Sequence, residues 1–446
     1  MHHKTIWVTI ARWVALLGLL LTLPLIVDSN TVKAAGNFYA VSGSAADVQT
    51  AINTALASDG GNVYIPSGNW SWSTNTVSWT GNNIKLLGTG ANTTYIYTTG
   101  TGAPISATGN NTRISGFHLE HADNTGTNGI KILGDSSDFR VDNMRIEGYG
   151  SEACIYVTGR YTTGVIDHNY LRARPLDNQG YGIIIRKSTD WWPASFFPTT
   201  EMQETEAVFI EDNTIVNSRH AIAATNGAYY VFRYNYVSGG FGNSSAKVDM
   251  HGVVGAATGT RYAEVYNNTI ELPTLTSFSI GPRGGDGVIY DNTVNGYTWA
   301  VAFFIESGQG GNYPTDYPIA HQVREYYVWD NGGTRTGEAT VSSLYSSNLY
   351  IQKDRDWFNY ALDGYTGYTY PHPLTQEVED EEEVGDEENA SDAGTAVLQT
   401  VLPIAIAGVI ILTVGGLARS PLLMLSGVVI GVLGLAIILS VLNSIP

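Results

Sequence analysis

The sequence contains very little cysteine and few charged side chains. Cys154 is the single cysteine among 446 residues, so no internal disulfide can form and stability must come from burial and backbone pairing. We interpret Cys154 as a small buried apolar residue rather than a nucleophile. Only 14% of the residues are charged, and 41 acidic against 23 basic side chains give a formal net charge of −18. Nucleic-acid binding is not expected, because it needs a basic surface.

Glycine, tyrosine and a repeated six-residue unit are abundant instead. The 50 glycines and 27 tyrosines fit a protein rich in turns and strands. The unit is an apolar residue, two variable residues, an asparagine, one variable residue and a second apolar residue. Its full copies are Ile166 to Leu171, Ile210 to Ile215, Phe232 to Val237, Val265 to Ile270 and Ile289 to Val294. Weaker copies are Val328 to Gly333, and Ile114 to Leu119 and Val141 to Ile146 with Phe117 and Met144 in place of the asparagine.

The spacing of these units predicts a solenoid of β-strands. Successive asparagine positions lie between 22 and 44 residues apart, and the shortest steps fall in the low to middle twenties. One short alternating strand per step indicates coils that cover each other's apolar faces. Asparagine suits the corner because it tolerates a left-handed backbone and can bond its neighbours in a ladder. The longer steps predict loops at 186–206 and 239–247. Chance recurrence of a common turn word is the alternative, which five full copies disfavour.

The amino-terminal segment predicts export. Lys4 and Arg12 precede an apolar run from Val14 to Val27, and small residues ending at Ala34 are placed for cleavage. This order of charge, apolar run and small residues is typical of a signal peptide, here residues 1–34. The alternative is a retained signal anchor, and both interpretations export the body of the protein.

The carboxyl-terminal segment predicts a stalk and a membrane anchor. Ten acidic residues lie between Glu377 and Asp392, and such a block repels itself, so residues 376–395 are expected to be an extended stalk. Val397 to Leu417 and Leu422 to Leu442 are each 21 residues without a charge, long enough to span a bilayer. With Arg419 on the cytoplasmic side, residues 396–443 are expected to form two transmembrane helices. The alternative is one span and one interfacial segment.

A second informative stretch lies before the repeats. Ala46, Val48, Ile52, Ala55 and Leu56 have helical spacing, and residues 62–66 then alternate like a strand. With the repeats, this stretch resembles the amino-terminal cap and first coil of pectate-lyase-like right-handed parallel β-helix proteins, over about residues 36–374. The resemblance implies an all-β, right-handed parallel β-helix at 36–375 with an amino-terminal capping helix. Tyr368 to Leu374 resembles the closing peptide of surface β-helix proteins, where prolines stop strand addition.

The motifs of two enzyme families with this fold are missing. Pectate lyases carry an Arg-x-Pro-x-x-Arg element, whereas Arg172-Ala173-Arg174-Pro175 has the wrong spacing. Polygalacturonases carry Asn-Thr-Asp and Gly-His-Gly, whereas Asn213-Thr214-Ile215 lacks the carboxylate and Met250-His251-Gly252 is a partial match. Neither activity can be carried over residue by residue.

One group of polar residues is nevertheless placed as a catalytic site would require. Stacked coils lie about 4.8 Å apart, so His220, Asp249 and His251 are expected to converge on one face. Alternation with Val248 and Met250 inward would leave Asp249 and His251 outward and accessible. Arg219 precedes His220 directly, while Arg233 belongs to a different strand end. The candidate catalytic residues are therefore His220, Asp249, His251, Arg219, Arg233 and Glu211.

Three chemistries can use such a group. In a lyase acting on an acidic sugar, His220 or His251 would be the base, with Arg219, Arg233 or Arg283 neutralising the developing charge. In a hydrolase, Asp249 and Glu211 would flank the scissile bond. A metal held by His220, Asp249 and His251 is a third hypothesis. The structural alternative is that these residues bond each other and the main chain to stabilise irregular coils.

An aromatic stripe predicts carbohydrate binding. Tyr266, Tyr290 and Trp329 occupy the same position of successive units, and Trp191 and Trp192 lie in a predicted loop. Aromatic faces stack on sugars, so these residues, with Arg283, are candidates for holding an extended glycan. Packing between coils that shields the sheet is an equal alternative.

These patterns lead to one leading hypothesis and one rival. The leading hypothesis is a cell-surface β-helix protein, anchored in the cytoplasmic membrane through its C-terminal helices, that binds and processes extracellular polysaccharide, with lyase action on an acidic glycan as one form. Its expected partner is an extracellular polysaccharide or surface glycan. No cofactor is assigned with certainty, and calcium is the candidate that the lyase hypothesis offers. The rival is a non-catalytic adhesin or structural surface protein.

Overall fold

The computed structural model describes residues 36–122, 126–173, 180–187, 207–239, 246–253, 258–309, 311–334 and 337–376. The chain divides into two units, Met1–Gln376 and Glu377–Pro446. The predicted signal peptide at 1–34, the transmembrane helices at 396–443 and nearly all of the stalk lie outside the described residues. Within the described ranges, no helix is both long enough and apolar enough to span a membrane.

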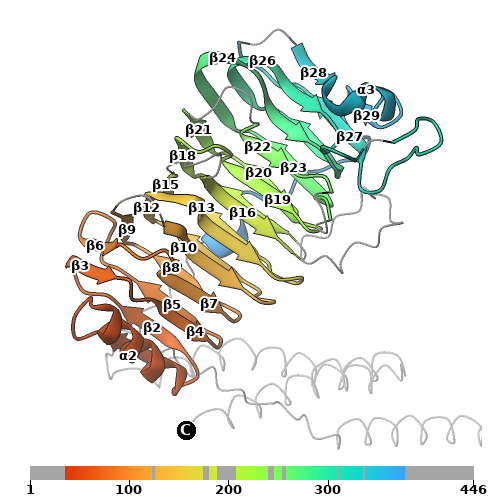
Figure 1. The fold of residues 1–446 in the computed structure, drawn as a ribbon. Coiled ribbons are helices and arrows are strands. Elements are labelled where there is room, and N and C mark those ends of the chain that lie inside the picture. The colour runs from red at the N-terminus through yellow and green to blue at the C-terminus, as the bar shows by residue number, and fades with distance from the viewer. Residues whose placement is uncertain are drawn as a thin grey trace, which may run out of the picture. The chain divides into compact units, whose positions relative to one another are not determined.

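Two parallel sheets build the body of the protein (Figure 1). Sheet A has 12 strands, which are β1 (Gly36–Tyr39), β2 (Gly61–Tyr64), β5 (Ile84–Leu87), β8 (Arg113–Ser115), β11 (Phe139–Asp142), β14 (Gly164–Asp167), β17 (Val208–Glu211), β20 (Tyr229–Arg233), β23 (Tyr262–Tyr266), β25 (Gly285–Tyr290), β27 (Val323–Trp329) and β29 (Trp357–Phe358).

Sheet B contains the remaining strands, in two rows that the long strands β24 and β26 join. These are β3 (Gly68–Ser73), β4 (Val77–Thr80), β6 (Thr94–Thr98), β7 (Ile105–Thr108), β9 (His118–His121), β10 (Gly126–Leu133), β12 (Arg145–Glu147), β13 (Tyr149–Thr158), β15 (Tyr170–Arg172), β16 (Tyr181–Arg186), β18 (Thr214–Val216), β19 (Ile222–Thr225), β21 (Tyr236–Ser238), β22 (Val248–Met250), β24 (Thr269–Pro282), β26 (Thr293–Phe303) and β28 (Gly337–Val341).

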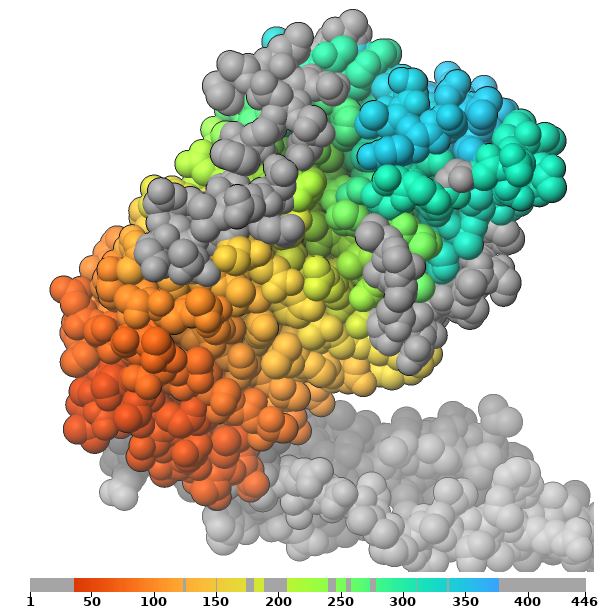
Figure 2. Space-filling model, in the orientation of Figure 1, coloured from red at the N-terminus to blue at the C-terminus, as the bar shows by residue number. Residues whose placement is uncertain are grey.

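The strands follow a coiled path. Each chain passage enters sheet A, turns a corner into sheet B, and pairs in parallel with the passages before and after it. Figure 2 shows the result as bands of colour that run in sequence order from red to blue-green. The structure therefore confirms the parallel β-helix, while its right-handed winding stays a prediction.

Helix α2 (Ala45–Leu56) forms where the spacing predicted it. The Ser44 side chain accepts a hydrogen bond from the Asp47 backbone at 3.2 Å, which satisfies one of the free amides at the helix start. Its buried residues are Ala45, Val48, Ala51, Ile52 and Ala55. They pack against β1, β2 and β4 at the first coils (Figure 1). The helix covers apolar surface that a first coil would otherwise expose.

The asparagines of the repeat form the expected ladder. Asn213 donates from Nδ2 to Asn235 Oδ1 at 3.0 Å, Asn235 to Asn268 at 3.0 Å, and Asn268 to Asn292 at 2.9 Å. All four side chains are buried. Each ladder oxygen also accepts the backbone amide of the preceding asparagine, as between Asn213 and Asn235 at 3.0 Å. The ladder therefore satisfies the polar backbone at the corner without water.

The backbone at the corner differs from the expectation. The left-handed residue is the one before the asparagine, for example Asp212 and Tyr234, both with φ 56°, and Asn267 with φ 55°. The preceding residue makes the turn, and this leaves the asparagine side chain pointing along the ladder. The asparagine recurs in successive coils because its side chain forms the ladder of hydrogen bonds. The positive φ at the corner belongs to the preceding residue.

Apolar residues stack in columns inside the coils. Ile210, Phe232, Val265 and Ile289 are Cα partners on successive strands of sheet A, and all are fully buried. Cys154 is a free, buried thiol, and burial raises its pKa above the ordinary value. A protonated, inaccessible thiol supports the interpretation of Cys154 as a small apolar residue.

The C-terminal strap, residues 360–376, lies elsewhere than predicted. Tyr365 contacts the ring of Tyr290, the Tyr368 carbonyl accepts from Arg233 at 2.9 Å, and Leu374 packs against the cluster that contains Val165. Figure 1 shows this blue segment returning towards the middle of the stack. Tyr368 to Leu374 therefore does not close the end of the solenoid. Its aromatic side chains cover the outer face of sheet A instead, which buries apolar surface that the sheet would expose.

Candidate functional site

Asp249, His251 and His220 converge on the outer face of sheet B, as the repeat predicts. His251 Nε2 lies 2.8 Å from Asp249 Oδ2, and His220 Nε2 lies 3.6 Å from the same oxygen. Val248 and Met250 point into the core on either side of Asp249. Alternation along β22 therefore places the carboxylate on the face opposite the core.

The expected accessibility of Asp249 is wrong. Asp249 is only 1% exposed. Its Cα partners on the two neighbouring strands are Ala223 and Gly281. The His251 side chain, in contrast, is 26% exposed. A ligand approaching this face can reach the imidazole of His251, while Asp249 lies beneath it.

Arg283 joins Asp249 to a second carboxylate, Glu306. Arg283 Nη1 lies 2.7 Å from Glu306 Oε2, and Arg283 Nη2 lies 2.6 Å from Asp249 Oδ1. The guanidinium also lies over the ring of Phe304, 5.4 Å from its centroid. Sequence reasoning missed Glu306. Its position could have indicated a role, because Glu306 lies one coil after Arg283. The hydrogen bond from the Phe304 amide to the Pro282 carbonyl shows that the two coils are adjacent there.

This arrangement opposes a metal held by His220, Asp249 and His251. Arg283 Nη2 lies 2.8 Å from His251 Nε2 and bonds both oxygens of Asp249. The cation that these groups share is therefore the guanidinium, and a metal at the same place would meet like charge at close range.

The charges of the cluster support one another. Burial alone raises the pKa of Asp249, but Arg283 and the two imidazoles hold it well below its ordinary value. Burial likewise raises the pKa of Glu306, and its bonds with His251 and Arg283 outweigh this and lower it. Burial lowers the pKa of His251, whereas Asp249 and Glu306 raise it above 6.5 in sum. At neutral pH both carboxylates are ionised, and His251 is the group poised to exchange a proton.

His220 has a different state. Burial lowers its pKa to about 4, so the ring is neutral at pH 7. Its Nδ1 contacts the Ala246 carbonyl oxygen, which can only accept, so Nδ1 carries the proton. The ring also stacks on Tyr181 at 5.2 Å, and Arg219 Nη1 donates to the Tyr181 hydroxyl at 3.1 Å. His220 and Arg219 thus support the wall of the cluster, and His220 is only 3% exposed.

Glu211 and Arg233 lie apart from this cluster. They belong to β17 and β20 of sheet A, where Arg233 Nη2 pairs with Glu211 Oε2 at 2.7 Å. Arg233 donates to the carbonyls of Tyr368 and Thr369, and Glu211 accepts from the His372 amide at 2.8 Å. Both side chains are fully buried. The pairing of Asp249 with Glu211 as hydrolytic carboxylates is therefore wrong, because Glu211 and Arg233 fasten the C-terminal strap to another sheet.

The aromatic stripe forms, and the strap packs against it. The Tyr266 and Tyr290 rings stack at 4.7 Å, and Tyr290 stacks on Trp329 at 4.4 Å with 2° between their planes. Tyr365 of the strap contacts both Tyr290 and Trp329 edge-on. Packing between coils is thus the observed role of these rings, and carbohydrate binding by them stays a prediction. Trp191 and Trp192 lie outside the described residues.

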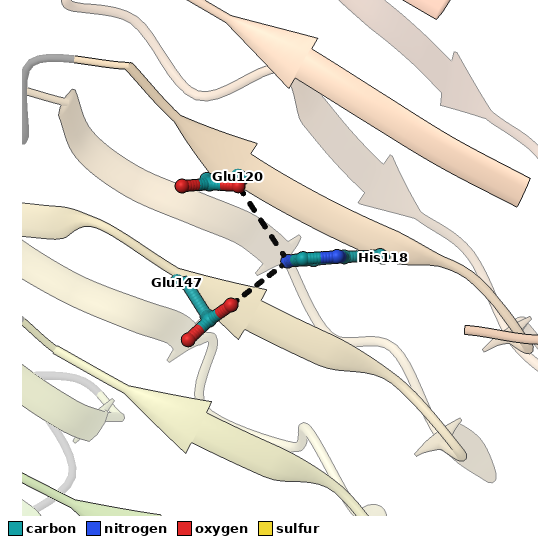
Figure 3. Close-up of side chains that lie close together, drawn as sticks. All are labelled: His118, Glu120 and Glu147. Carbon is teal, nitrogen blue, oxygen red and sulfur yellow. Dashed lines mark ion pairs between the residues drawn. The ribbon is translucent and has the colours of Figure 1, made fainter. Parts of the chain in front are cut away.

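A second polar group lies on sheet B and was not predicted. His118 and Glu120 on β9 and Glu147 on β12 point towards one another (Figure 3). The signal was in the weaker repeat units, since each of these residues follows Phe117 or Met144 by one or three positions. These two units lack the asparagine, and their outward positions nevertheless carry the charged residues.

The comparisons with known proteins concern the fold. No protein-family model and no curated protein sequence matches the chain. Three of the solved structures similar to it are ORF18 of Geobacillus virus E2, the A-module of mannuronan C-5 epimerase AlgE4 from Azotobacter vinelandii, and the catalytic unit of a GH87 α-1,3-glucanase from Streptomyces thermodiastaticus. The virus protein is 13% identical, with TM-score 0.40, over 66% of this chain and 56% of its own length.

The two enzymes are equally distant in sequence. The epimerase module is 15% identical with TM-score 0.40, over 71% of this chain and 91% of its own. The glucanase unit is 16% identical with TM-score 0.36, over 70% and 71%. At this level of identity, and with TM-scores below 0.5, the activities of these proteins cannot be inferred for this chain. The parallel β-helix rests on the strand pairing of this protein itself.

Proposed function

We propose that this protein binds and modifies an extracellular polysaccharide, and that His251 is the residue that exchanges a proton with the substrate. The observation that carries the proposal is a partly exposed imidazole that lies on buried charges. The His251 side chain is 26% exposed, while Asp249 beneath it is 1% exposed and ionised. Burying a charge is costly unless it is fully paired. A buried, ionised carboxylate beneath one accessible imidazole is therefore an arrangement typical of proton-transfer sites.

The neighbours of His251 allow the ring to take up and release a proton at Nε2. In the protonated form Nε2–H donates to Asp249 Oδ2 at 2.8 Å, and in the neutral form Nε2 accepts from Arg283 Nη2 at 2.8 Å. In the neutral form Nε2 has its partner in Arg283, whereas in the protonated form Arg283 Nη2 must move away, because two N–H donors would otherwise meet at 2.8 Å. Glu306 Oε2, 3.5 Å from Nδ1, adds to the stability of the charged form.

Lyase action on an acidic glycan is the form of the reaction that this geometry supports best. His251 would remove the proton next to the sugar carboxylate, the electron pair would form the new double bond, and the glycosidic oxygen would leave with a proton from the newly protonated His251 or from solvent. Arg283 brings positive charge beside the base, where the developing enolate needs it. Hydrolysis by two carboxylates is less well supported. Asp249 and Glu306 both have lowered pKa values, so neither supplies the proton that a leaving group needs.

The rival function, a non-catalytic adhesin, also has an observation in its favour. Arg283 is bonded by two carboxylates and only 11% of its side chain is exposed. A guanidinium compensated in this way can have a purely structural role, in which it holds three coils together. Under this function the long solenoid itself would be the binding surface, and His251 could be replaced without effect.

Incubation with glycans separates the two functions. The full-length protein, His251→Gln and a control variant, His168→Asn, would be incubated with uronate-containing glycans with and without calcium, and unsaturated products and new reducing ends measured. His168 is a suitable control because its side chain is 53% exposed beside Asp167 at a sheet A corner. We expect product from wild type and control, and at least a hundredfold less from His251→Gln. Product from none of them, with glycan binding unchanged in His251→Gln, would favour the adhesin.

The place of the protein at the cell surface belongs to the same proposal and rests on the sequence alone. The signal peptide at 1–34 and the apolar segments at 397–417 and 422–442 support export and anchoring in the cytoplasmic membrane, with the β-helix outside. External protease added to intact cells should cut within the acidic stretch 377–392. A stretch that stays protected until the cells are lysed contradicts this placement.

A further inference from the structure

The residues His118, Glu120 and Glu147 form a compact group on the outer face of sheet B (Figure 3). His118 and Glu120 are alternate residues of β9, and Glu147 is the Cα partner of Glu120 on β12 in the next coil. Leu119 and Ile146, between and beside them, are fully buried in the core. Alternation therefore places all three polar side chains on one face, one coil spacing apart.

The distances within the group suit a small metal ion. His118 Nε2 lies 3.0 Å from Glu147 Oε2 and 3.9 Å from Glu120 Oε2. One ligand atom from each residue lies within 4.8 Å of the other two. Ligands of a tetrahedral zinc ion, each about 2.1 Å from the metal, lie about 3.4 Å from one another. Side-chain movements of less than about 1 Å would bring the three atoms to that spacing.

The contacts of His118 Nε2 are a further observation at the same place. This buried atom is paired with Glu147 Oε2 at 3.0 Å, but none of its contacts among the described residues is aligned as a hydrogen bond. A buried polar atom is costly unless its hydrogen bonds are well formed, and a metal between the nitrogen and the two carboxylates would satisfy it. The ring cannot easily turn away, because it packs edge-on against Tyr95 at 4.6 Å.

The surrounding side chains orient the two carboxylates. Arg172 Nε lies 2.8 Å from Glu147 Oε1, the oxygen turned away from His118, and the Tyr95 hydroxyl bonds Glu120 Oε2, which faces His118 and keeps a second lone pair for a metal. Such outer partners fix the direction of metal-binding groups. Arg145 Nε acts differently, because it bonds Glu147 Oε2 at 2.8 Å, the oxygen that also faces His118. Its side chain is 41% exposed, so it can turn to solvent when the oxygen takes another partner.

We propose that His118, Glu120 and Glu147 bind one transition-metal dication of the zinc type. An imidazole nitrogen with two carboxylate oxygens is a set that zinc accepts, whereas calcium prefers oxygen ligands alone. Once Arg145 has turned to solvent, the two carboxylates supply negative charge for the dication. This site is on different strands from the Asp249 cluster, and it stands or falls independently of the proposed activity.

The test is titration of zinc chloride into the chelator-treated full-length protein, followed by calorimetry. We expect one site per chain in wild type, at least tenfold weaker binding in His118→Ala, and at least tenfold weaker binding in Glu120→Gln. Glu120 has a side chain that is 32% exposed, so this second variant should fold even if His118→Ala does not. Calcium chloride should give no comparable binding.

Two further variants distinguish this site from general surface binding. Arg145→Met removes the competitor for Glu147 Oε2 and should bind zinc more tightly than wild type. His168→Asn removes an exposed histidine that is also paired with a carboxylate, and it should bind as wild type does. Absence of zinc binding in wild type, or equal affinity in wild type, His118→Ala and Glu120→Gln, would overturn the proposal.

Discussion

Replacement of Asn235 by alanine should destabilise the solenoid strongly. The Asn235 side chain donates to the carbonyls of Ile210 and Arg233, both at 2.9 Å, and to Asn268 Oδ1 at 3.0 Å. It accepts from the backbone and the side chain of Asn213, both at 3.0 Å. The two N–H groups of Asn235 are shared among three acceptors, so the side chain makes the equivalent of about four buried hydrogen bonds. At a net contribution of about 1 kcal/mol each, the expected loss is about 4 kcal/mol in the free energy of unfolding.

Denaturant unfolding followed by tryptophan fluorescence measures this loss. The matched control is Asn53→Ala, because Asn53 lies on the exposed side of α2 and should change stability by less than about 0.5 kcal/mol. Backbone amide exchange should also become faster at residue 213, whose amide loses its acceptor. A loss below about 1 kcal/mol in Asn235→Ala, or a loss equal to that of the control, would refute the view that the ladder holds the coils together.

Two other consequences can be tested in the same way. Burial raises the pKa of Glu264 from 4.5 to about 7, so the folded state holds this proton more tightly. The contribution of this proton to the free energy of unfolding is complete below pH 4.5 and is lost, by up to about 3 kcal/mol, as the pH rises through 7. Thermal melts should show this pH-dependent loss in wild type and not in Glu264→Gln. Arg233→Met leaves Glu211 as an unpaired buried charge and should cost about 3–5 kcal/mol. Limited proteolysis should then cut the C-terminal strap, residues 360–376, faster than in wild type, and equal rates would contradict its role as a fastener.

The sequence predicted those features that repeat along it. The asparagine ladder follows from a unit that recurs once per coil, and the convergence of His220, Asp249 and His251 follows from stacking those coils. The strap did not follow, because Arg233 and Tyr368 are 135 residues apart and no period connects them. The role of Glu211 and Arg233 could therefore not be inferred, since it depends on what covers sheet A.

Burial on the outer face was equally hidden from the sequence. Alternation gives the direction of Asp249 correctly, but whether an outward side chain is exposed depends on its neighbours in three dimensions. Here the guanidinium of Arg283 and the ring of His251 lie against it. The group around His118 was not predicted for a different reason, because its two repeat units carry Phe117 and Met144 in place of the asparagine and the repeat signal there is weak.

The most direct measurement of the central claim is the pH dependence of glycan turnover in wild type and in Glu306→Gln. Asp249 and Glu306 raise the pKa of His251 above 6.5, and a base must be unprotonated to act. Turnover should therefore rise with pH through a midpoint above 6.5 in wild type. Loss of the Glu306 charge should move that midpoint to lower pH. A midpoint that is the same in both proteins would contradict the assignment of His251 as the proton-transfer residue. So would turnover that does not depend on pH between about 4.5 and 8.5, two units either side of an ordinary histidine pKa.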